Sequence, residues 1–562
     1  MYTSIIYTQN KNWEWVLYIG SPGFPSEVGD ITIKNNNYYL RGVYGGTPFR
    51  IGSYIIPDMN GSTEMYIAKM DTNLNILWAK HFGANNCMYL SYCEEYEYIN
   101  SFVVDDSDNV YVSGITTGPN LTFDSIVLPG NISTSNTYYT SSFFVAKYNK
   151  NGKCVWAKNT KNPNVDYPLW DSGGIILEKG EYLFVRLSKV TVPLIYDQDT
   201  IPANMKYIIK INKSNGQIVD KWKDTLAGSV SPNTYYFDII SHKNNYYILG
   251  DGSILMRDTM GNKIWEIRPL GSYYIFNKMF MYKDTLYALG IFTEIGIDGN
   301  LYTSSSSNWD LFLMKIAPDG KVIYLKPFGG SGRETLGIIS FNKDNIYIMI
   351  NPGAYSFYID SICYVDGSTK VDPNRFLILN TNNGKCIQSF HFYDIGITSK
   401  LSGNFSGSID YRDVLVSSIL FINDNMLMFS AFENQTTIGT FTVDNAIPGC
   451  GGPSLLWCPG DMFFAKMKGN PLTNNIPSTN KIIEDYFFVY PNPSDGSFNI
   501  DISYDLLPCS LKIIDITGRV LFNKELSDST NTLHIPNYAS GTYIFQIKTK
   551  EGKTMQKKVI KK

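Results

Sequence analysis

The fold of this chain is decided by a stretch that recurs along it, first as MYIAKMDTNLNILWAK from Met65 and again as SFFVAKYNKNGKCVWAK from Ser142. Each copy joins an apolar run, a turn rich in Asn, Asp and Gly, and a second apolar run that often carries Trp. These are the signals of a strand, a tight turn and a second strand. Weaker copies begin at Lys206, Ser253, Asp310 and Arg375, and half a copy begins at Asp461. The repeat therefore predicts a succession of β-hairpins.

A second element recurs between these hairpins and leads from a polar turn into an aromatic strand. Its seven copies begin at Ile31, Ser101, Gly173, Asp238, Lys278, Ile338 and Ile419. A shorter third element usually follows, as in TFDSIVLPG from Thr122. Three elements at a regular spacing are typical of an architecture built by repetition.

The numbers of first and second hairpin strands predict how the repeats are arranged. The first hairpin strand follows all seven copies of the second element, but the second hairpin strand follows only six, because the copy at Asp461 runs into a linker. The segment WEWVLYIG from Trp13 resembles the missing strand. We therefore expect an all-β fold with a seven-bladed β-propeller, closed by pairing Trp13–Gly20 with Asp461–Lys468. Six or eight blades remain open.

The composition agrees with an all-β chain and argues against nucleic-acid binding and against a transmembrane helix. The 562 residues include 41 Tyr, 31 Phe and 46 Gly, which favour strands and turns. Because 48 Lys and Arg face 51 Asp and Glu, we expect no general affinity for nucleic acid. No apolar run reaches the roughly 18 residues that a transmembrane helix needs, so no transmembrane segment is predicted.

The repeat ends near Asn470 and a different module follows. Residues 1–470 are the predicted propeller, and residues 471–481, rich in Pro, Asn, Ser and Thr, are the predicted linker. Residues 482–562 contain short alternating strands broken by Pro-Asn-Pro, Asp-Gly, Thr-Gly and Ser-Gly. That pattern is typical of a small β-sandwich.

The C-terminal module closely resembles the type A C-terminal sorting domain of the type IX secretion system in Bacteroidetes. The matching residues are Tyr490, Pro491, Asn492, Pro493, Gly496, Gly518, Gly541, Thr542 and Tyr543. The resemblance implies an Ig-like sandwich read by the secretion machinery, and a protein secreted or anchored at the outer cell surface. The hairpin repeat likewise resembles repeats of secreted bacterial propellers. The chain opens without a signal peptide, and we expect that this leader is missing from the sequence.

Cysteine spacing gives a second indication of export. Cys87 and Cys93 bracket a short loop, as do Cys450 and Cys458, and each pair could form a local disulfide or stay reduced. The remaining cysteines (Cys154, Cys363, Cys386 and Cys509) are expected to stay reduced on strands. No CxxC pair occurs and the histidines are scattered singly, so the sequence predicts no cofactor and identifies no metal site.

The sequence offers no catalytic constellation. His81 and His242 are interpreted as structural. The acidic run Asp105–Asp108 is interpreted as a turn whose side chains cap their own backbone, with calcium binding as the alternative. We therefore predict no catalytic residue, although the enzyme question stays open.

Two functions remain. The first is a surface-anchored propeller that acts as a binding, adhesion or scaffold module for a glycan or protein. The alternative is an extracellular enzyme, such as a polysaccharide hydrolase or lyase or a quinoprotein-like oxidoreductase, with its site in the propeller channel. Aromatic residues in polar loops are the candidates for ligand contact; they are Tyr138, Tyr139, Trp170 and Trp309.

Overall fold

The computed structural model describes strands along most of the chain. The described residues are 13–20, 26–44, 49–56, 64–84, 98–118, 120–132, 139–161, 175–190, 193–203, 205–223, 238–250, 252–304, 309–330, 335–351, 356–359, 362–365, 375–391, 397–399, 414–432, 436–438, 441–443, 461–469, 487–490, 494–502, 507–528, 530–550, 552 and 554–562. Within these ranges the structure is all-β and contains no helix. The predicted linker, residues 471–481, lies outside them.

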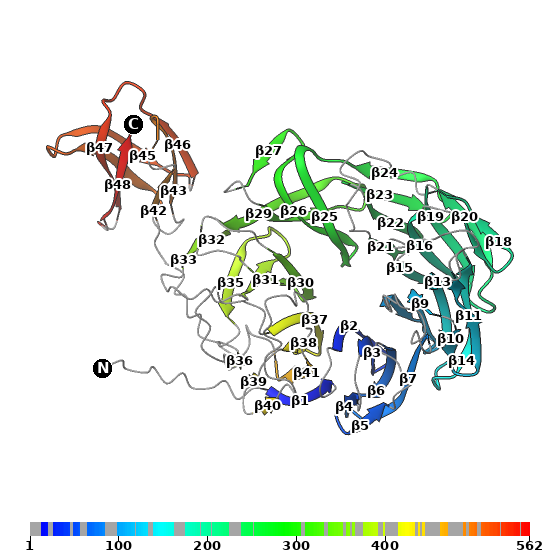
Figure 1. The fold of residues 1–562 in the computed structure, drawn as a ribbon. Coiled ribbons are helices and arrows are strands. Elements are labelled where there is room, and N and C mark those ends of the chain that lie inside the picture. The colour runs from blue at the N-terminus through cyan, green and yellow to red at the C-terminus, as the bar shows by residue number, and fades with distance from the viewer. Residues whose placement is uncertain are drawn as a thin grey trace. The chain divides into compact units, whose positions relative to one another are not determined.

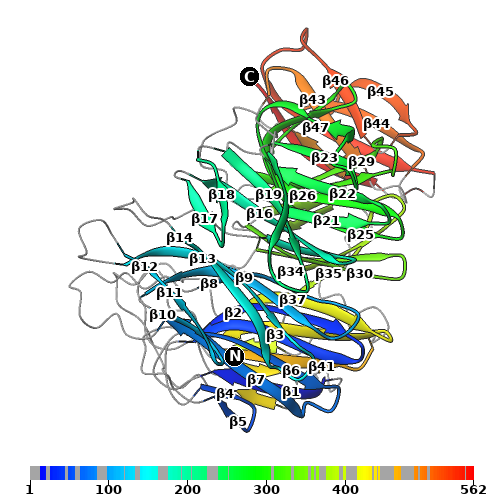
Figure 2. The same ribbon diagram turned by 90° about the vertical axis from the view of Figure 1, so that its right-hand side faces the viewer.

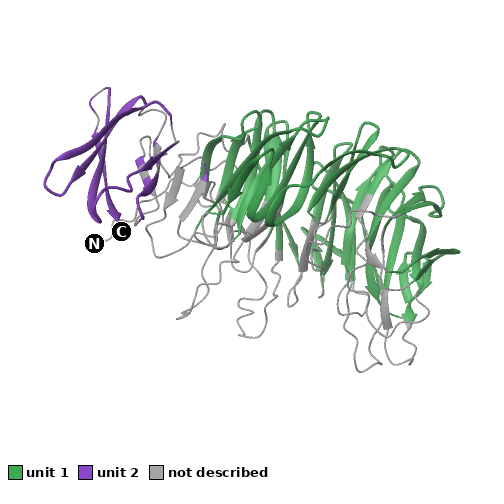
Figure 3. Ribbon diagram, turned by 90° about the horizontal axis from the view of Figure 1, so that it is seen from above, with its two compact units in different colours: residues 1–355, 368–477 green, residues 356–367, 478–562 purple. Residues whose placement is uncertain are grey.

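The chain divides into two compact units. Unit 1 comprises residues 1–355 and 368–477, and unit 2 comprises residues 356–367 and 478–562 (Figure 3). Most of unit 2 is therefore the C-terminal module, together with the short hairpin β32 (Ser356–Ile359) and β33 (Ile362–Val365).

Unit 1 is a series of antiparallel sheets that follow one another in chain order (Figure 1). In the first sheet, β2 (Ser26–Lys34), β3 (Asn37–Tyr44), β6 (Glu64–Asp71) and β7 (Ile76–Ala84) lie in that order. The predicted aromatic element supplies β2 and β3, and the predicted hairpin supplies β6 and β7. Both predictions are confirmed for this sheet.

The same pattern recurs in the five sheets that follow. Their strands are, in order within each sheet, β8 (Tyr98–Val104), β9 (Val110–Thr117), β13 (Tyr139–Tyr148) and β14 (Cys154–Lys161); β15 (Ile175–Lys179), β16 (Tyr182–Val190), β19 (Met205–Asn212) and β20 (Ile218–Lys223); β21 (Asp238–His242), β22 (Asn245–Gly250), β23 (Ser253–Asp258) and β24 (Lys263–Ile267); β25 (Leu270–Tyr282), β26 (Thr285–Ile297), β28 (Asp310–Ile316) and β29 (Val322–Gly330); and β30 (Thr335–Asn342), β31 (Asn345–Asn351), β34 (Arg375–Asn380) and β35 (Cys386–His391). In addition, β12 (Asn131–Ile132) pairs with β13, and β27 (Asn300–Thr303) pairs with β26.

One sheet joins the two ends of unit 1, and we call it the closing sheet. It contains β37 (Val414–Ile422), β38 (Asn425–Phe432), β41 (Asp461–Met467) and β1 (Trp13–Gly20). Strands β1 and β41 are antiparallel, with Val16 opposite Ala465. The predicted pairing of these two segments, more than four hundred residues apart in sequence, is confirmed.

The third sequence element has a position that the sequence did not indicate. It forms a small hairpin that pairs with the outer strand of the preceding sheet, and we call such a hairpin a lent hairpin. The lent hairpins are β4 (Phe49–Ile51) with β5 (Tyr54–Ile56) on β1, β10 (Asn120–Phe123) with β11 (Ile126–Pro129) on β7, and β17 (Leu194–Tyr196) with β18 (Asp199–Ile201) on β14 (Figure 2). Another three-stranded sheet contains β36 (Ile397–Ser399), β39 (Thr436–Ile438) and β40 (Phe441–Val443). Pairing of this kind covers edges that would otherwise expose unpaired backbone groups.

A tryptophan on the outer strand of one sheet contacts the hairpin turn of the next. The Nε1 of Trp78 donates to the Lys150 carbonyl oxygen at 2.9 Å, and its ring lies against Gly152. The same contact is made by Trp156 with the turn at Gly216, and by Trp265 with the turn at Gly320. These glycines have positive φ, which suits a turn, and their lack of a Cβ leaves room for the ring.

A series of polar contacts links the turns of consecutive aromatic elements. Lys34 pairs with Asp106, Lys213 with both Asp105 and Glu178, Lys243 with Asp284, Lys283 with Asp344, and Lys343 with Asp424. Between them, Lys179 donates to the carbonyl oxygen of Lys243. The contacts run from the first sheet to the closing sheet, so each sheet is held to the next at its turns.

The C-terminal module of unit 2 contains two sheets around one core. One sheet has β42 (Phe487–Tyr490), β43 (Ser497–Ile502) and β46 (Thr530–His534); the other has β45 (Val520–Leu526), β44 (Cys509–Asp515), β47 (Gly541–Thr549) and β48 (Thr554–Lys561). Phe498 of the first sheet meets Phe545 of the second, with ring centroids 5.3 Å apart. The core draws apolar side chains from both sheets.

Candidate functional site

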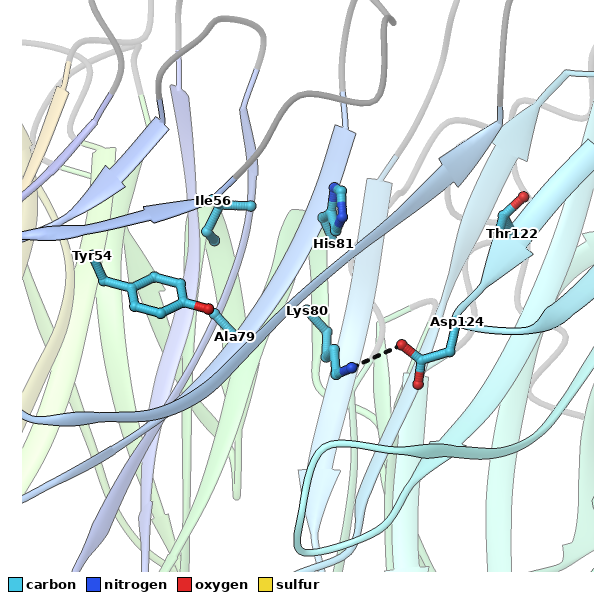
Figure 4. Close-up of a pocket in the computed structure, with 7 residues that line it drawn as sticks. All are labelled: Tyr54, Ile56, Ala79, Lys80, His81, Thr122 and Asp124. Carbon is cyan, nitrogen blue, oxygen red and sulfur yellow. Dashed lines mark hydrogen bonds and ion pairs between the residues drawn. The ribbon is translucent and has the colours of Figure 1, made fainter.

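A pocket of about 250 Å³ opens beside the outer strand of the first sheet, and we call it the edge pocket. Its walls come from β5, from β7, from β10 and from the turn after β10 (Figure 4). The lining residues are Tyr54, Ile56, Ala79, Lys80, His81, Thr122 and Asp124. Because β5 and β10 belong to lent hairpins, consecutive repeats assemble this pocket together.

His81 is held in the edge pocket by a buried carboxyl group. Its Nδ1 lies 3.2 Å from Oε2 of Glu64 and 3.4 Å from the hydroxyl of Tyr44. The Tyr44 hydroxyl donates to the same Glu64 oxygen at 2.8 Å. The Glu64 side chain is 7% exposed, whereas that of His81 is 25% exposed and reaches the pocket.

The strand register explains how these three residues meet. Tyr44, the last residue of β3, lies directly opposite Glu64, the first residue of β6. On the other side of β6, His81 lies opposite Tyr66. Because Glu64 engages Nδ1, Nε2 is the ring nitrogen of His81 that can interact with a ligand in the pocket.

Lys80 and Asp124 form an ion pair across the edge pocket. Figure 4 shows the two side chains directed toward each other, with Nζ of Lys80 2.9 Å from Oδ1 of Asp124. The other carboxylate oxygen of Asp124 accepts the backbone N–H of Cys154 at 2.7 Å. The next sheet repeats this arrangement with Lys158 and Asp197, 3.0 Å apart. At both positions the ion pair links an outer strand to its lent hairpin.

The thiol next to this site is not activated. Burial, with the Asp124 carboxylate close by, raises the pKa of Cys154 to about 12. A nucleophilic cysteine needs a lowered pKa. Cys154 is thus a buried strand residue, as the repeat position predicted, and Cys509 of unit 2 is buried as well.

The predicted acidic turn behaves as the sequence indicated. Oδ1 of Asp105 accepts the backbone N–H groups of Ser107 and Asn109, each at 2.9 Å. The described residues contain no group of three or more His, Cys, Asp or Glu side chains arranged to hold a metal ion.

The predicted ligand-loop residues are only partly described. Trp309 lies just before β28 and stacks on Tyr273, with ring centroids 5.3 Å apart and an interplanar angle of 15°. Tyr139 begins β13, although its side chain is outside the described part. The remaining candidates on loops, namely Tyr138, Trp170, Cys87, Cys93, Cys450 and Cys458, lie outside the described residues. The structure does not bring Trp309 into the edge pocket.

The residues of the predicted sorting motif lie at turns and strand ends of unit 2. Tyr490 ends β42, and Pro491, Asn492 and Pro493 lie outside the described residues. Gly496 and Gly518 have φ of +115° and +87° in turns. Gly541, Thr542 and Tyr543 begin β47, and the Tyr543 hydroxyl donates to the carbonyl oxygen of Ala539 at 2.6 Å.

The sequence did not single out the residues that distinguish the edge pocket. Tyr54 and Ile56 come from a lent hairpin. Glu64 is the first residue of a strand, where a charged side chain is normally expected to be exposed to solvent. His81 was noted but interpreted as structural. Across the described part of the chain, the structure has no helix with the length and apolar character needed to cross a membrane.

Comparison with known families identifies the C-terminal module. Residues 488–562 match the family described as the secretion system C-terminal sorting domain. No curated protein matches the chain.

Solved structures give distant similarities. PorZ of Porphyromonas gingivalis, described as an essential bacterial surface component of the type IX secretion system, is 11% identical, with 98% of this chain and 100% of that chain covered and a TM-score of 0.21. Hsv2 of Kluyveromyces lactis is 11% identical, with 78% and 99% covered and a TM-score of 0.29. The extracellular domain of BT4673 from B. thetaiotaomicron, described as a putative one component system, is 11% identical over 100% of this chain, with a TM-score of 0.32, and this chain spans 59% of its length.

Proposed function

We propose that this chain, which carries a type IX C-terminal sorting domain and is therefore a secreted or cell-surface protein, is a binding or adhesion protein. Its residues 1–470 would be a seven-bladed β-propeller, residues 471–481 a linker, and residues 482–562 an Ig-like sandwich. Secretion machinery is the partner of the C-terminal domain, and a glycan or protein is the partner of the propeller.

Three features support the propeller. The aromatic elements form two-stranded hairpins at all seven positions where the sequence places them. Each repeat contacts the next through its turn residues, and β37 of the closing sheet contacts β2 of the first sheet. Strand β1 completes the last sheet with residues from the other end of the unit. A ring of blades accounts for all three.

The observation that carries the binding function is the sorting domain joined to a series of sheets, three of which have a lent hairpin on their outer strand. Export places the protein where ligands are other cells, glycans and extracellular proteins. Lent hairpins cover the outer strands β1, β7 and β14, which protects these edges from pairing with other chains. Such a scaffold can present loops and pockets rigidly without a catalytic centre.

One observation favours the alternative of an extracellular enzyme. His81 faces a pocket and is held by the buried Glu64 carboxyl, and a histidine held in this way can act as a general base. Catalysis would also need a nucleophile or acid at a matching distance, and the pocket lining supplies Lys80 and Asp124 already paired with each other.

The test of the export step uses cells that possess the type IX system. The full chain, supplied with a Sec leader, should become sensitive to protease added outside the cells. A version that lacks residues 488–562 should stay protected. If both versions reach the surface equally, the sorting domain is not the address.

The test of the binding function uses the purified full chain on arrays of glycans and of extracellular-matrix proteins. We expect retention of at least one ligand class with a dissociation constant in the micromolar to millimolar range. An unrelated protein fused to residues 488–562 is the control, since it carries the sorting domain alone. Cleavage of a polysaccharide without stable retention would instead support the enzyme.

A further inference from the structure

We propose that the edge pocket binds one residue of a neutral carbohydrate. The proposal rests on the binding function above and assigns a ligand class and a site to it. Trp309, the aromatic loop candidate whose side chain the structure describes, does not line this pocket.

The size of the pocket fits a single sugar ring. A cavity of about 150 Å³ can hold a benzene molecule, so a volume of about 250 Å³ leaves room for a six-membered ring with polar substituents. A pyranose with its hydroxyl groups occupies a space of that order. The ligand would be a free monosaccharide or the terminal residue of a glycan.

One wall of the pocket is apolar and carries an aromatic ring. Ile56 is buried, Ala79 is partly buried, and Tyr54 is 40% exposed. Figure 4 shows the Tyr54 ring extending from β5 toward Ala79. A half-exposed tyrosine at a cavity offers a flat apolar face and a polar tip, which suits the C–H face of a sugar.

The other wall supplies donors and acceptors together. Lys80 has three ammonium protons, of which Asp124 takes one, and Thr122 carries a hydroxyl group that can donate and accept. The Nε2 of His81 adds a further hydrogen-bonding group, because Glu64 holds the other ring nitrogen. Sugar hydroxyls also donate and accept, so they can use both kinds of group at once.

The ion pair argues against other ligand classes. A simple anion would have to compete with the Asp124 carboxylate for Lys80 and would be repelled by it. An apolar ligand would remove water from Lys80 and Asp124 without replacing those hydrogen bonds, which is costly. A neutral hydroxylated ligand leaves the pair intact and adds hydrogen bonds to it.

The next sheet shows which parts are special to the pocket. There Lys158 and Asp197 repeat the ion pair. The counterpart of His81 is Asn159, which lies opposite Phe144 and donates to the carbonyl oxygen of Pro129 at 2.8 Å. The pair alone is thus a structural link, whereas Tyr54 and the held His81 belong to the edge pocket. This second pair also provides a matched control.

The experiment titrates the purified full chain with free monosaccharides by calorimetry and saturation-transfer NMR. The panel contains neutral hexoses, N-acetylhexosamines and fucose, with inorganic phosphate and acetate as anion arms. The variants are Tyr54→Ala, Tyr54→Phe, Asp124→Asn and the control Asp197→Asn, each checked by thermal unfolding.

We expect one neutral sugar to bind with a dissociation constant below about 10 mM. Tyr54→Ala and Asp124→Asn should each weaken it at least about tenfold, as expected for a lost stacking face or a lost charged hydrogen bond. Tyr54→Phe and Asp197→Asn should bind as the wild type does. If Tyr54→Ala does not fold, the test rests on the other pair of variants: Asp124→Asn should weaken sugar binding and Asp197→Asn should not.

Three results would overturn the proposal. They are binding of phosphate or acetate in place of sugars, sugar binding that is equal in all four variants, and no sugar binding up to about 10 mM. If the chain still binds glycans or proteins on the arrays in any of these cases, the binding function stands and only this pocket assignment fails.

Discussion

At the scale of the residue, glycines in the hairpin turns leave space for an aromatic ring of the neighbouring sheet, because glycine has no side chain. A Cβ on Gly152 would lie 2.8 Å from the ring of Trp78, closer than real Cβ contacts allow. The ring in turn keeps its hydrogen bond to the turn through Lys150. The same turn therefore needs glycine for its backbone and for its packing.

This double requirement predicts an unequal cost for two glycine substitutions. Gly180→Ala should cost about 1 kcal/mol, because Gly180 has φ of +59° but open space around it. Gly152→Ala, with φ of +77°, should cost a further amount of about 1–3 kcal/mol because the methyl group collides with Trp78. Denaturant unfolding of both variants measures the difference. Equal costs would show that the tryptophan contact does not hold the sheets together.

Lys326 gives a prediction about pH. Burial lowers the pKa of Lys326 to about 8, with the Cys386 thiol nearby opposing that effect. In the unfolded chain the ammonium keeps its proton up to about pH 10.5. The unfolded state therefore binds more protons between about pH 8 and 10.5, so this site makes the fold more stable as pH rises through that window.

The substitution Lys326→Met removes the buried charge and keeps a long side chain. We expect its melting temperature at pH 7 to exceed that of the wild type by a few degrees, and the gain to shrink toward pH 10. Lys321→Met, at an exposed position on the preceding turn, is the control for the change of side chain. A gain that is independent of pH would point to packing alone.

The residue scale also marks the limit of sequence reasoning at the site. His81 was visible in the sequence, but its partners stand 17 and 37 residues earlier, at Glu64 and Tyr44. They meet because of strand register, and register between three strands has no local signature. Tyr54 lines the edge pocket from a hairpin that is paired with another sheet. Such a pairing is even more difficult to predict from the sequence.

At the scale of the element, turn chemistry explains why so much of the fold was predictable. The hairpins combine Asn, Asp and Gly turns with apolar flanks, and local sequence decides both features. Several central turn residues have positive φ, such as Asn35, Asn36, Lys283 and Asp284, as tight hairpins require. Propensity and fold agree at these points, so the repeat could be recognised from sequence.

The lent hairpins could not be placed from sequence because their pairing joins one repeat to another. The third sequence element, TFDSIVLPG, forms the two short strands β10 and β11. Its partner, β7, lies in the preceding repeat, with Leu121 opposite Ala84. Nothing in either segment specifies this neighbour.

Removal of a lent hairpin should expose the strand that it covers. Replacing residues 120–129 by a short Gly-Ser turn leaves the end of β7 without its partner, so its amides should exchange hydrogen faster. The uncovered edge should also promote self-association. Exchange mass spectrometry on β7 and light scattering measure the two effects.

The control for this change removes β27, which pairs with β26 of its own sheet. That deletion should leave exchange in the outer strand β29 unchanged. If the two deletions behave alike, the lent hairpin is only a surface loop and does not protect an edge.

At the scale of the whole molecule, the closing sheet decides whether unit 1 forms a ring. The sequence predicted this pairing from a missing strand, and β1 does lie beside β41. The ion pair between Glu14 and Lys466 and the contact of Trp15 with Phe464 tie the two segments side by side. The number of blades follows from the same strand count and remains part of the proposal.

A disulfide across the closing sheet tests this arrangement directly. In Val16→Cys/Ala465→Cys the two cysteines lie opposite each other on antiparallel strands, at a spacing that a disulfide can bridge. The crosslink encloses roughly 450 residues, and the chain-entropy model gives up to about 6 kcal/mol for such a loop, less any strain. We therefore expect the oxidised variant to melt at a higher temperature than the wild type.

Val16→Cys/Lys466→Cys is the control, because adjacent residues of a strand face opposite sides of the sheet. If the first pair forms no crosslink, or if the crosslink leaves the melting temperature unchanged, β1 does not close the unit.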